Sequence, residues 1–154
     1  MTGSSRRAVR DDPLNLDRFV EAQSPIYAAV VDELRLGRKR SHWMWFIFPQ
    51  LQGLGVSDTA QRYGIKSLEE AHEYLSHPVL GPRIVECTRL VNDCIGHDVH
   101  DIFGTPDDVK FHSSMTLFAF AAAPRSEFAC ALSRFFSGRP DAQTCELLRD
   151  ISHS

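Results

Sequence analysis

One segment of the chain places cationic side chains directly against its richest run of aromatic residues. The basic stretch 38–40 and His42 precede the run from Trp43 to Phe48, which holds both tryptophans of the chain. An imidazole titrates near pH ~6.5 and so suits general acid or base chemistry, while an indole ring offers a flat surface for stacking. The residue types therefore predict a ligand site here, with His42 as a catalytic residue and Trp43 as the stacking wall.

A second stretch carries polar groups within an otherwise apolar helical pattern. Lys110 and Ser114 are four residues apart and share one face of a helix, and Ser113 and Thr116 stand close by. An ammonium group beside hydroxyls suits an anionic or polyhydroxyl ligand, and Asp107 is placed to orient Lys110 or to act as a base. Lys110 is thus the second predicted catalytic residue. The plainer interpretation is that these hydroxyls bond back to the preceding helical turn.

We hypothesise that the two stretches share one pocket for a small anionic or nucleotide-derived ligand. Loops beside a rigid aromatic wall often carry binding residues, and Gln50 lies in such a break just after the aromatic run. The residue pattern leaves open whether the protein is an enzyme. The expected ligand-binding residues are Trp43, Gln50, Asp107, Ser113, Ser114 and Thr116.

Two other functions fit the same residues. An exposed part of the aromatic segment would serve a protein–protein interaction module, since aromatic and arginine side chains dominate interface hot spots. A structural or stress-related helper without a ligand is the third class. The aromatic run is also compatible with plain central core, because an uninterrupted apolar run does not reveal its own periodicity.

Length, charge and composition narrow the possible partners and the cellular location of the protein. The 154 residues carry a formal net charge of -3 and no long basic block, which argues against duplex nucleic acid as a partner. No apolar stretch approaches the ~20 residues that cross a membrane as a helix, and the N-terminal arginines are followed by acidic residues rather than an apolar signal sequence. The four cysteines lack C-x-x-C pairing. We therefore expect a cytoplasmic protein.

Known catalytic and metal-binding motifs do not occur in the chain. Neither the G-x-S-x-G hydrolase motif nor the glycine-rich loops of dinucleotide and P-loop proteins are found. His97 and His100 are one helical turn apart with carboxylates nearby, but they lack a clear third ligand. We expect no metal and no cofactor.

Helix boundaries rather than strand patterns punctuate the sequence. Ser67 and Glu70 have the spacing of a capping box, and the apolar positions between Pro82 and Ile95 recur at helical spacing before Gly96 stops them. No stretch alternates with period two. The fold class expected is all-α, a compact single-domain bundle of about six to eight helices with irregular loops over residues 14–150, after a flexible N-terminal tail over residues 1–13.

Several separated motifs follow one another in a characteristic order. They are SHWMWFIFPQ (41–50), GLG (53–55), RYGI (62–65), EA (70–71), YL (74–75), HPVLG (77–81), FG (103–104), Lys110 and SSMTLF (113–118). Over Leu16 to Leu147 they resemble the bacterial domain-of-unknown-function family 1810. The resemblance implies a compact, mainly α-helical domain and no established activity.

Two points qualify this resemblance. Some members carry the label calpastatin, but this chain lacks the disordered, repeat-rich composition of a protease-wrapping inhibitor. Phe111 also stands where the family pattern leads us to expect an aliphatic residue. Neither point alters the fold that the resemblance implies.

Overall fold

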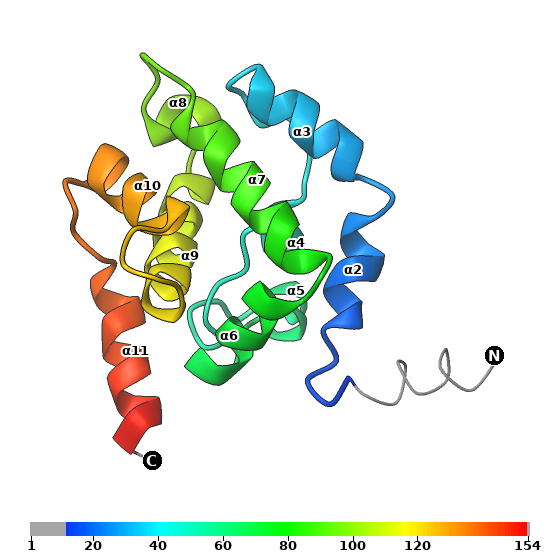
Figure 1. The fold of residues 1–154 in the computed structure, drawn as a ribbon, viewed down its shortest axis with the longest axis vertical. Helices are drawn as coiled ribbons and strands as arrows, with labels where there is room; N and C mark the ends of the chain where they lie inside the picture. The colour runs from blue at the N-terminus through cyan, green and yellow to red at the C-terminus, as the bar shows by residue number, and fades with distance from the viewer. Residues whose placement is uncertain (1–11, 154) are drawn as a thin grey trace.

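The computed structural model describes residues 12–153, and ten helices form the fold within this range (Figure 1). They are α2 (Asp17–Gln23), α3 (Tyr27–Arg35), α4 (Met44–Ile47), α5 (Asp58–Arg62), α6 (Leu68–Ser76), α7 (Leu80–Asn92), α8 (Val99–Phe103), α9 (Asp107–Ala121), α10 (Glu127–Phe136) and α11 (Ala142–His153). The described residues contain no strand, only an isolated parallel bridge between Leu51 and Ile65. The prediction of an all-α single domain is confirmed.

The expected number of six to eight helices is wrong. The structure has ten helices within residues 12–153, and three of them, α4, α5 and α8, have only four or five residues. A helix this short spans little more than one turn, so it leaves no repeating apolar stripe for a sequence pattern to detect.

Most of the expected tail over residues 1–13 lies outside the described residues, which begin at Asp12. The carboxylate of Asp12 accepts hydrogen bonds from the backbone amides of Leu16 (2.8 Å) and Asp17 (3.0 Å). A carboxylate bonded to the first amides of a helix stabilises that end. Contacts with the start of α2 therefore begin at Asp12.

Serine caps set the beginning of several helices, as their local sequence predicts. The hydroxyls of Ser57, Ser67 and Ser126 each accept a hydrogen bond from the amide three residues later. At Ser67 the predicted capping partner behaves differently, because Glu70 accepts from the Lys66 amide at 2.8 Å and pairs with Arg18. Glu70 thus ties the start of α6 to α2.

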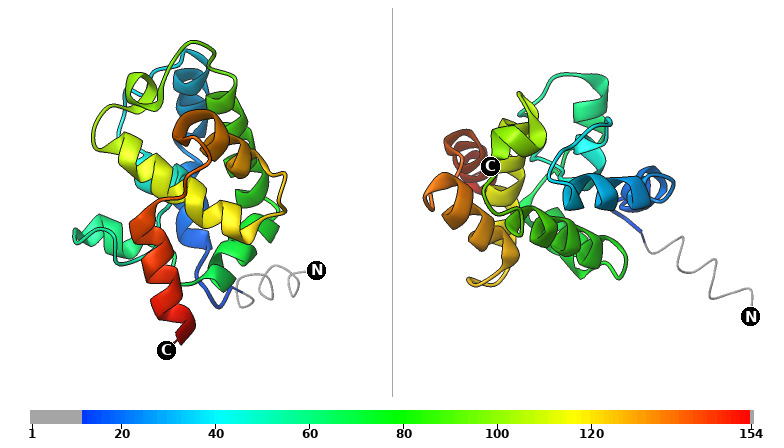
Figure 2. Two further views of the ribbon diagram at one scale, coloured as in Figure 1. Left: turned by 90° about the vertical axis from the view of Figure 1, so that its left-hand side faces the viewer. Right: turned by 90° about the horizontal axis from the view of Figure 1, so that it is seen from above.

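The core is built around α9. This helix packs against α6, α8, α10 and α11, while α7 packs against α3, α6 and α10. Figure 2 shows α2 and α3 on one side of the molecule and α10 and α11 on the other, with α7 and α9 between them. Phe111 and Phe118 on α9 are fully buried, and Phe111 lies 5.1 Å from Phe48 and 4.8 Å from Phe103 between ring centroids. The aromatic segment thus packs directly on α9.

Arg18 joins three separate parts of the chain at the edge of this core. Its guanidinium donates to the carbonyl oxygens of Arg62 (2.9 Å) and Gly64 (3.2 Å), to the carboxylate of Glu70 (3.0 Å) and to two carbonyls of its own segment. All five N–H groups of an arginine are thereby used. Arg18 therefore fixes the end of α5 against α2 and α6.

Candidate functional site

The short helix α4 carries the centre of the aromatic segment and is held by a buried amide. The side chain of Gln23 is 1% exposed, and its Nε2 donates to the carbonyl of Phe46 at 2.7 Å and to the hydroxyl of Tyr74 at 2.9 Å. A buried side chain with both donors used fixes the backbone that it contacts. The orientation of α4 is therefore set from α2 and α6.

The loop before α4 closes around the carboxylate of Glu33. This carboxylate accepts hydrogen bonds from the amides of Arg40 (2.7 Å) and Ser41 (3.1 Å), from the Ser41 hydroxyl and from the indole nitrogen of Trp43 (2.9 Å). Burial by itself raises the pKa of Glu33, but these hydrogen bonds outweigh it and bring the pKa down to about 2. Glu33 is therefore ionised at neutral pH and clamps residues 40–43.

One carboxylate links the two lysines that flank the aromatic segment. Asp107 lies 2.8 Å from the ammonium of Lys39 and 3.6 Å from that of Lys110. The same two ammonium groups lie over indole rings, Lys39 at 5.2 Å from the centroid of Trp43 and Lys110 at 4.3 Å from that of Trp45. Two cations share one anion, so this cluster keeps one net positive charge.

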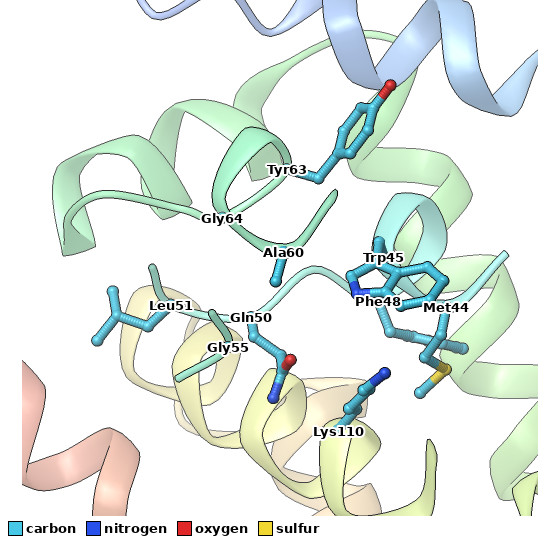
Figure 3. Close-up of a pocket in the computed structure, with 10 residues that line it drawn as sticks. All are labelled: Met44, Trp45, Phe48, Gln50, Leu51, Gly55, Ala60, Tyr63, Gly64 and Lys110. Carbon is cyan, nitrogen blue, oxygen red and sulfur yellow. The ribbon is translucent and has the colours of Figure 1, made fainter. Parts of the chain in front are cut away.

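A small pocket lies beside this cluster, between α4, α9 and the segment before α6. Figure 3 shows Lys110 and Gln50 extending into it, with Trp45 and Met44 on one side. Its cavity volume is about 10 Å³, room for about one water molecule. The lining residues are Met44, Trp45, Phe48, Gln50, Leu51, Gly55, Ala60, Tyr63, Gly64 and Lys110.

The tryptophan at the pocket is Trp45, not Trp43. Trp43, predicted as the stacking wall, is 1% exposed and packs against Phe48 and Phe103. Successive residues of a helix are rotated by roughly 100°, so the side chains of residues two positions apart face nearly opposite directions. Trp43 is the residue at which the chain enters α4, so its side chain is directed into the core and that of Trp45 to the pocket.

The other residues predicted from the aromatic segment separate. Gln50 lines the pocket together with Lys110, so the structure brings one residue of each predicted stretch to the same place. His42 is exposed and is not among the lining residues. His42 therefore does not contribute to the wall of this pocket.

Two of the three predicted hydroxyls on α9 hold α11. The hydroxyl of Ser113 donates to the Val109 carbonyl (3.3 Å) and to the carboxylate of Asp141 (3.5 Å). Thr116 donates to the His112 carbonyl (2.8 Å) and accepts from the amide of Asp141 (2.8 Å). Ser113 and Thr116 therefore fasten the start of α11 and do not line the pocket.

Ser114, the third hydroxyl, behaves differently from its neighbours. Its side chain is 0% exposed, and its oxygen has no hydrogen-bond partner among the described residues. Ser114 is not one of the residues that line the pocket, although Lys110, one helical turn earlier, is.

The histidine pair between α7 and α9 is not arranged around a metal. Within the described residues no group of three or more His, Cys, Asp and Glu side chains is placed to hold a metal ion. His100 Nδ1 instead lies 3.4 Å from the carboxylate of Asp108 and 3.2 Å from the hydroxyl of Thr105.

Across residues 12–153 no helix is long and apolar enough to cross a membrane.

Sequence reasoning missed Lys39 and Trp45 as parts of the site. Lys39 stands between Arg38 and Arg40 in one basic stretch of the sequence, yet its side chain is only 8% exposed and pairs with Asp107. Buried lysines are nearly always paired, but the chain does not reveal which of three adjacent cations turns inward. The partner is 68 residues away in sequence, so no local pattern reveals it.

These features define a single-domain, all-helical protein with a small cationic and aromatic pocket. The chain belongs to the family described as a protein of unknown function (DUF1810), which matches residues 13–148. It is similar to the solved structure of the conserved hypothetical protein Rv1873 from Mycobacterium tuberculosis. That comparison gives 56% identity and a TM-score of 0.88, and covers 90% of this chain and 99% of the other. No curated protein matches the chain.

Proposed function

We propose that the pocket binds a small anionic ligand through Lys110, with Trp45 as its aromatic wall and Gln50 as a hydrogen-bonding side chain. The observation that carries this proposal is the unequal sharing of Asp107, which lies 2.8 Å from Lys39 but 3.6 Å from Lys110. A ligand anion is able to take over Lys110 while Asp107 stays with Lys39. The net charge of the cluster then falls from one positive charge toward zero, which favours binding.

The ligand enters by movement of the segment 52–64, which we call the flap. Gly55, Ala60, Tyr63 and Gly64 of the flap line one side of the pocket, and α5 within it has no buried residue. Two backbone hydrogen bonds close its base, from Ile65 to the Gln50 carbonyl (2.8 Å) and from Gln52 to the Ile65 carbonyl (2.7 Å). Elements with little buried surface open at low free-energy cost, so the part of the flap before Arg62 and Gly64, whose carbonyls Arg18 holds, is the wall that moves.

The aromatic wall favours a nucleotide-derived anion over a purely aliphatic one, because a nucleobase stacks on an indole ring.

The proposal is for binding rather than catalysis, since His42 lies outside the pocket. Docking of a protein partner on the aromatic segment has less support, because Trp43, Met44, Ile47 and Phe48 are each at most 2% exposed. A cytoplasmic location fits the four free cysteines.

The test is a tryptophan-fluorescence titration with adenosine monophosphate and with uncharged adenosine. We expect saturable quenching by the monophosphate in the wild-type protein and at least tenfold weaker binding in Lys110→Ala, because the mutation removes the charge over Trp45. The matched control is Lys66→Ala, which removes an exposed lysine that does not line the pocket. Equal affinities in Lys110→Ala and wild type would refute the proposal.

A further inference from the structure

Ser114 has a buried hydroxyl that the fold leaves without a partner. Ser113 and Thr116, on the same helix, both donate to the carbonyl four residues earlier and both contact Asp141. Ser114 has no hydrogen-bond partner among the described residues and is 0% exposed. A buried hydroxyl without a partner costs free energy, so each case requires an explanation.

The position of Ser114 on α9 connects it to the proposed anion site. Residues four apart share one face of a helix, which puts Ser114 one turn further along the face that carries Lys110. Lys110 extends into the pocket, as Figure 3 shows. Thr88 and Asn92 also have unpartnered oxygens, but both are on α7 and not on the helix that carries Lys110. Ser114 is the buried hydroxyl for which the fold supplies a neighbouring site.

We propose that Ser114 is the inner hydrogen-bond donor of this site and that the group bound there is a phosphoryl group. This inference rests on the proposed function. Lys110, Gln50 and Ser114 offer an ammonium, an amide and a hydroxyl from two separate elements of the fold. Three donors match the three free oxygens of a phosphate monoester better than the two coplanar oxygens of a carboxylate.

The small pocket must widen for this to occur. A volume of about 10 Å³ holds about one water molecule, which is smaller than a phosphoryl group. Opening of the flap, defined above as residues 52–64, supplies the space without moving α9. The phosphoryl group then contacts Lys110 first and reaches Ser114 one turn deeper.

The test combines a titration with a stability measurement on Ser114→Ala and the matched control Ser113→Ala. Inorganic phosphate and acetate are the probes, and tryptophan fluorescence is the readout. We expect Ser114→Ala to weaken phosphate binding at least tenfold while its Tm stays equal to or rises by a few degrees above that of wild type, because the mutation removes an unpaired buried group. Ser113→Ala should lower the Tm and leave phosphate affinity unchanged, since it loses the contact with Asp141.

Each alternative result has a distinct meaning. If Ser114→Ala binds phosphate like wild type while Lys110→Ala does not, the proposed function survives and the role of Ser114 is refuted. A drop of several degrees in the Tm of Ser114→Ala would also refute it, by showing that the hydroxyl has a partner within the fold. Equal affinity for acetate and phosphate would overturn the phosphoryl class. If neither those probes nor adenosine monophosphate affects wild-type fluorescence, the proposed function fails together with this inference.

Discussion

The indole nitrogen of Trp43 donates a hydrogen bond of 2.9 Å to the carboxylate of Glu33, ten residues earlier in the chain. This bond joins α3 to the entrance of α4, and the same carboxylate holds the two amides at positions 40 and 41. Lys39, just before that loop, pairs with Asp107, which in turn contacts Lys110. Glu33 therefore sits at the origin of a chain of contacts that ends in the pocket.

Replacing Glu33 by Gln should destabilise the protein by about 2 kcal/mol at pH 7, because hydrogen bonds to a charged acceptor are each worth roughly 1.5–3 kcal/mol and an amide retains some of them. The pKa of Glu33, about 2 in the folded protein, lies below the ordinary value of ~4.3 for an unfolded chain. Its stabilisation is thus fully present above pH ~4.3 and is lost as the pH falls toward 2.

Urea unfolding of wild type and Glu33→Gln at pH 7, 4 and 3 measures this effect. The stability difference should shrink as the pH falls. Glu73→Gln, an exposed glutamate on α6, serves as the control and should stay within about 0.5 kcal/mol of wild type. A difference that remains constant across this pH range would show that the charge of Glu33 is not the source of the stability.

Arg18→Ala should cost about 3–5 kcal/mol of stability, because it leaves Glu70 buried without its cation. The side chains of Arg18 and Glu70 are 9% and 1% exposed, so solvent cannot replace the lost partner. Adding Glu70→Gln to Arg18→Ala should recover part of the loss by removing the uncompensated charge.

Chemical denaturation of the two single variants and the double variant gives the coupling energy between Arg18 and Glu70. Arg62→Ala is the matched control, because its guanidinium lies over the ring of Tyr63 at 5.6 Å and forms no ion pair among the described residues. Strictly additive losses in the double variant would contradict a direct interaction between Arg18 and Glu70.

The helical class was predictable from local signals, whereas the details of the site were not. A cap such as Ser67 involves an amide three residues away, so the sequence contains the whole interaction. The choice between Trp43 and Trp45 depends on the direction in which a four-residue helix enters the core, and that direction is set by Glu33 and Gln23 from other helices.

The polar residues of α9 also show that local sequence does not predict contacts between helices. Spacing placed Lys110 and Ser114 on one face of a helix, a local relationship. Ser113 and Thr116 instead bind Asp141 at the start of α11, a contact that spans 28 and 25 residues. No periodicity within α9 indicates which of its polar positions meets another helix and which remains unpaired.

The flap, residues 52–64, should show faster amide hydrogen exchange than α9, since α5 has no buried residue and α9 is mostly buried. Gly55→Ala should speed this exchange further. A Cβ at position 55 would stand 2.7 Å from the Cβ of Ala60, well inside the ~3.5–4.0 Å of normal carbon contact, so the flap must shift.

Hydrogen-exchange mass spectrometry of wild type and Gly55→Ala tests this, with peptides from α9 as the internal reference. Exchange should rise in residues 52–64 and remain unchanged in α9. If both regions exchange equally fast in wild type, the flap is no more mobile than the core and access to the pocket requires a different opening.

The four cysteines should react with a thiol reagent in an order set by burial. Cys130 is exposed, whereas Cys87 is 0% exposed, and burial raises the pKa of the Cys87 thiol to about 12. Because the thiolate is the reactive species, Cys87 should stay unmodified at pH 8 until the protein unfolds. Titration with Ellman's reagent should therefore show one rapid phase that disappears in Cys130→Ser, and the remaining thiols should appear only slowly or in urea. Modification of native Cys87 detected by peptide mapping would show that α7 opens to solvent on the timescale of labelling, contrary to its position in the core. Persistence of the rapid phase in Cys130→Ser would contradict the predicted order by showing that another thiol, such as the half-buried Cys145 of α11, reacts first.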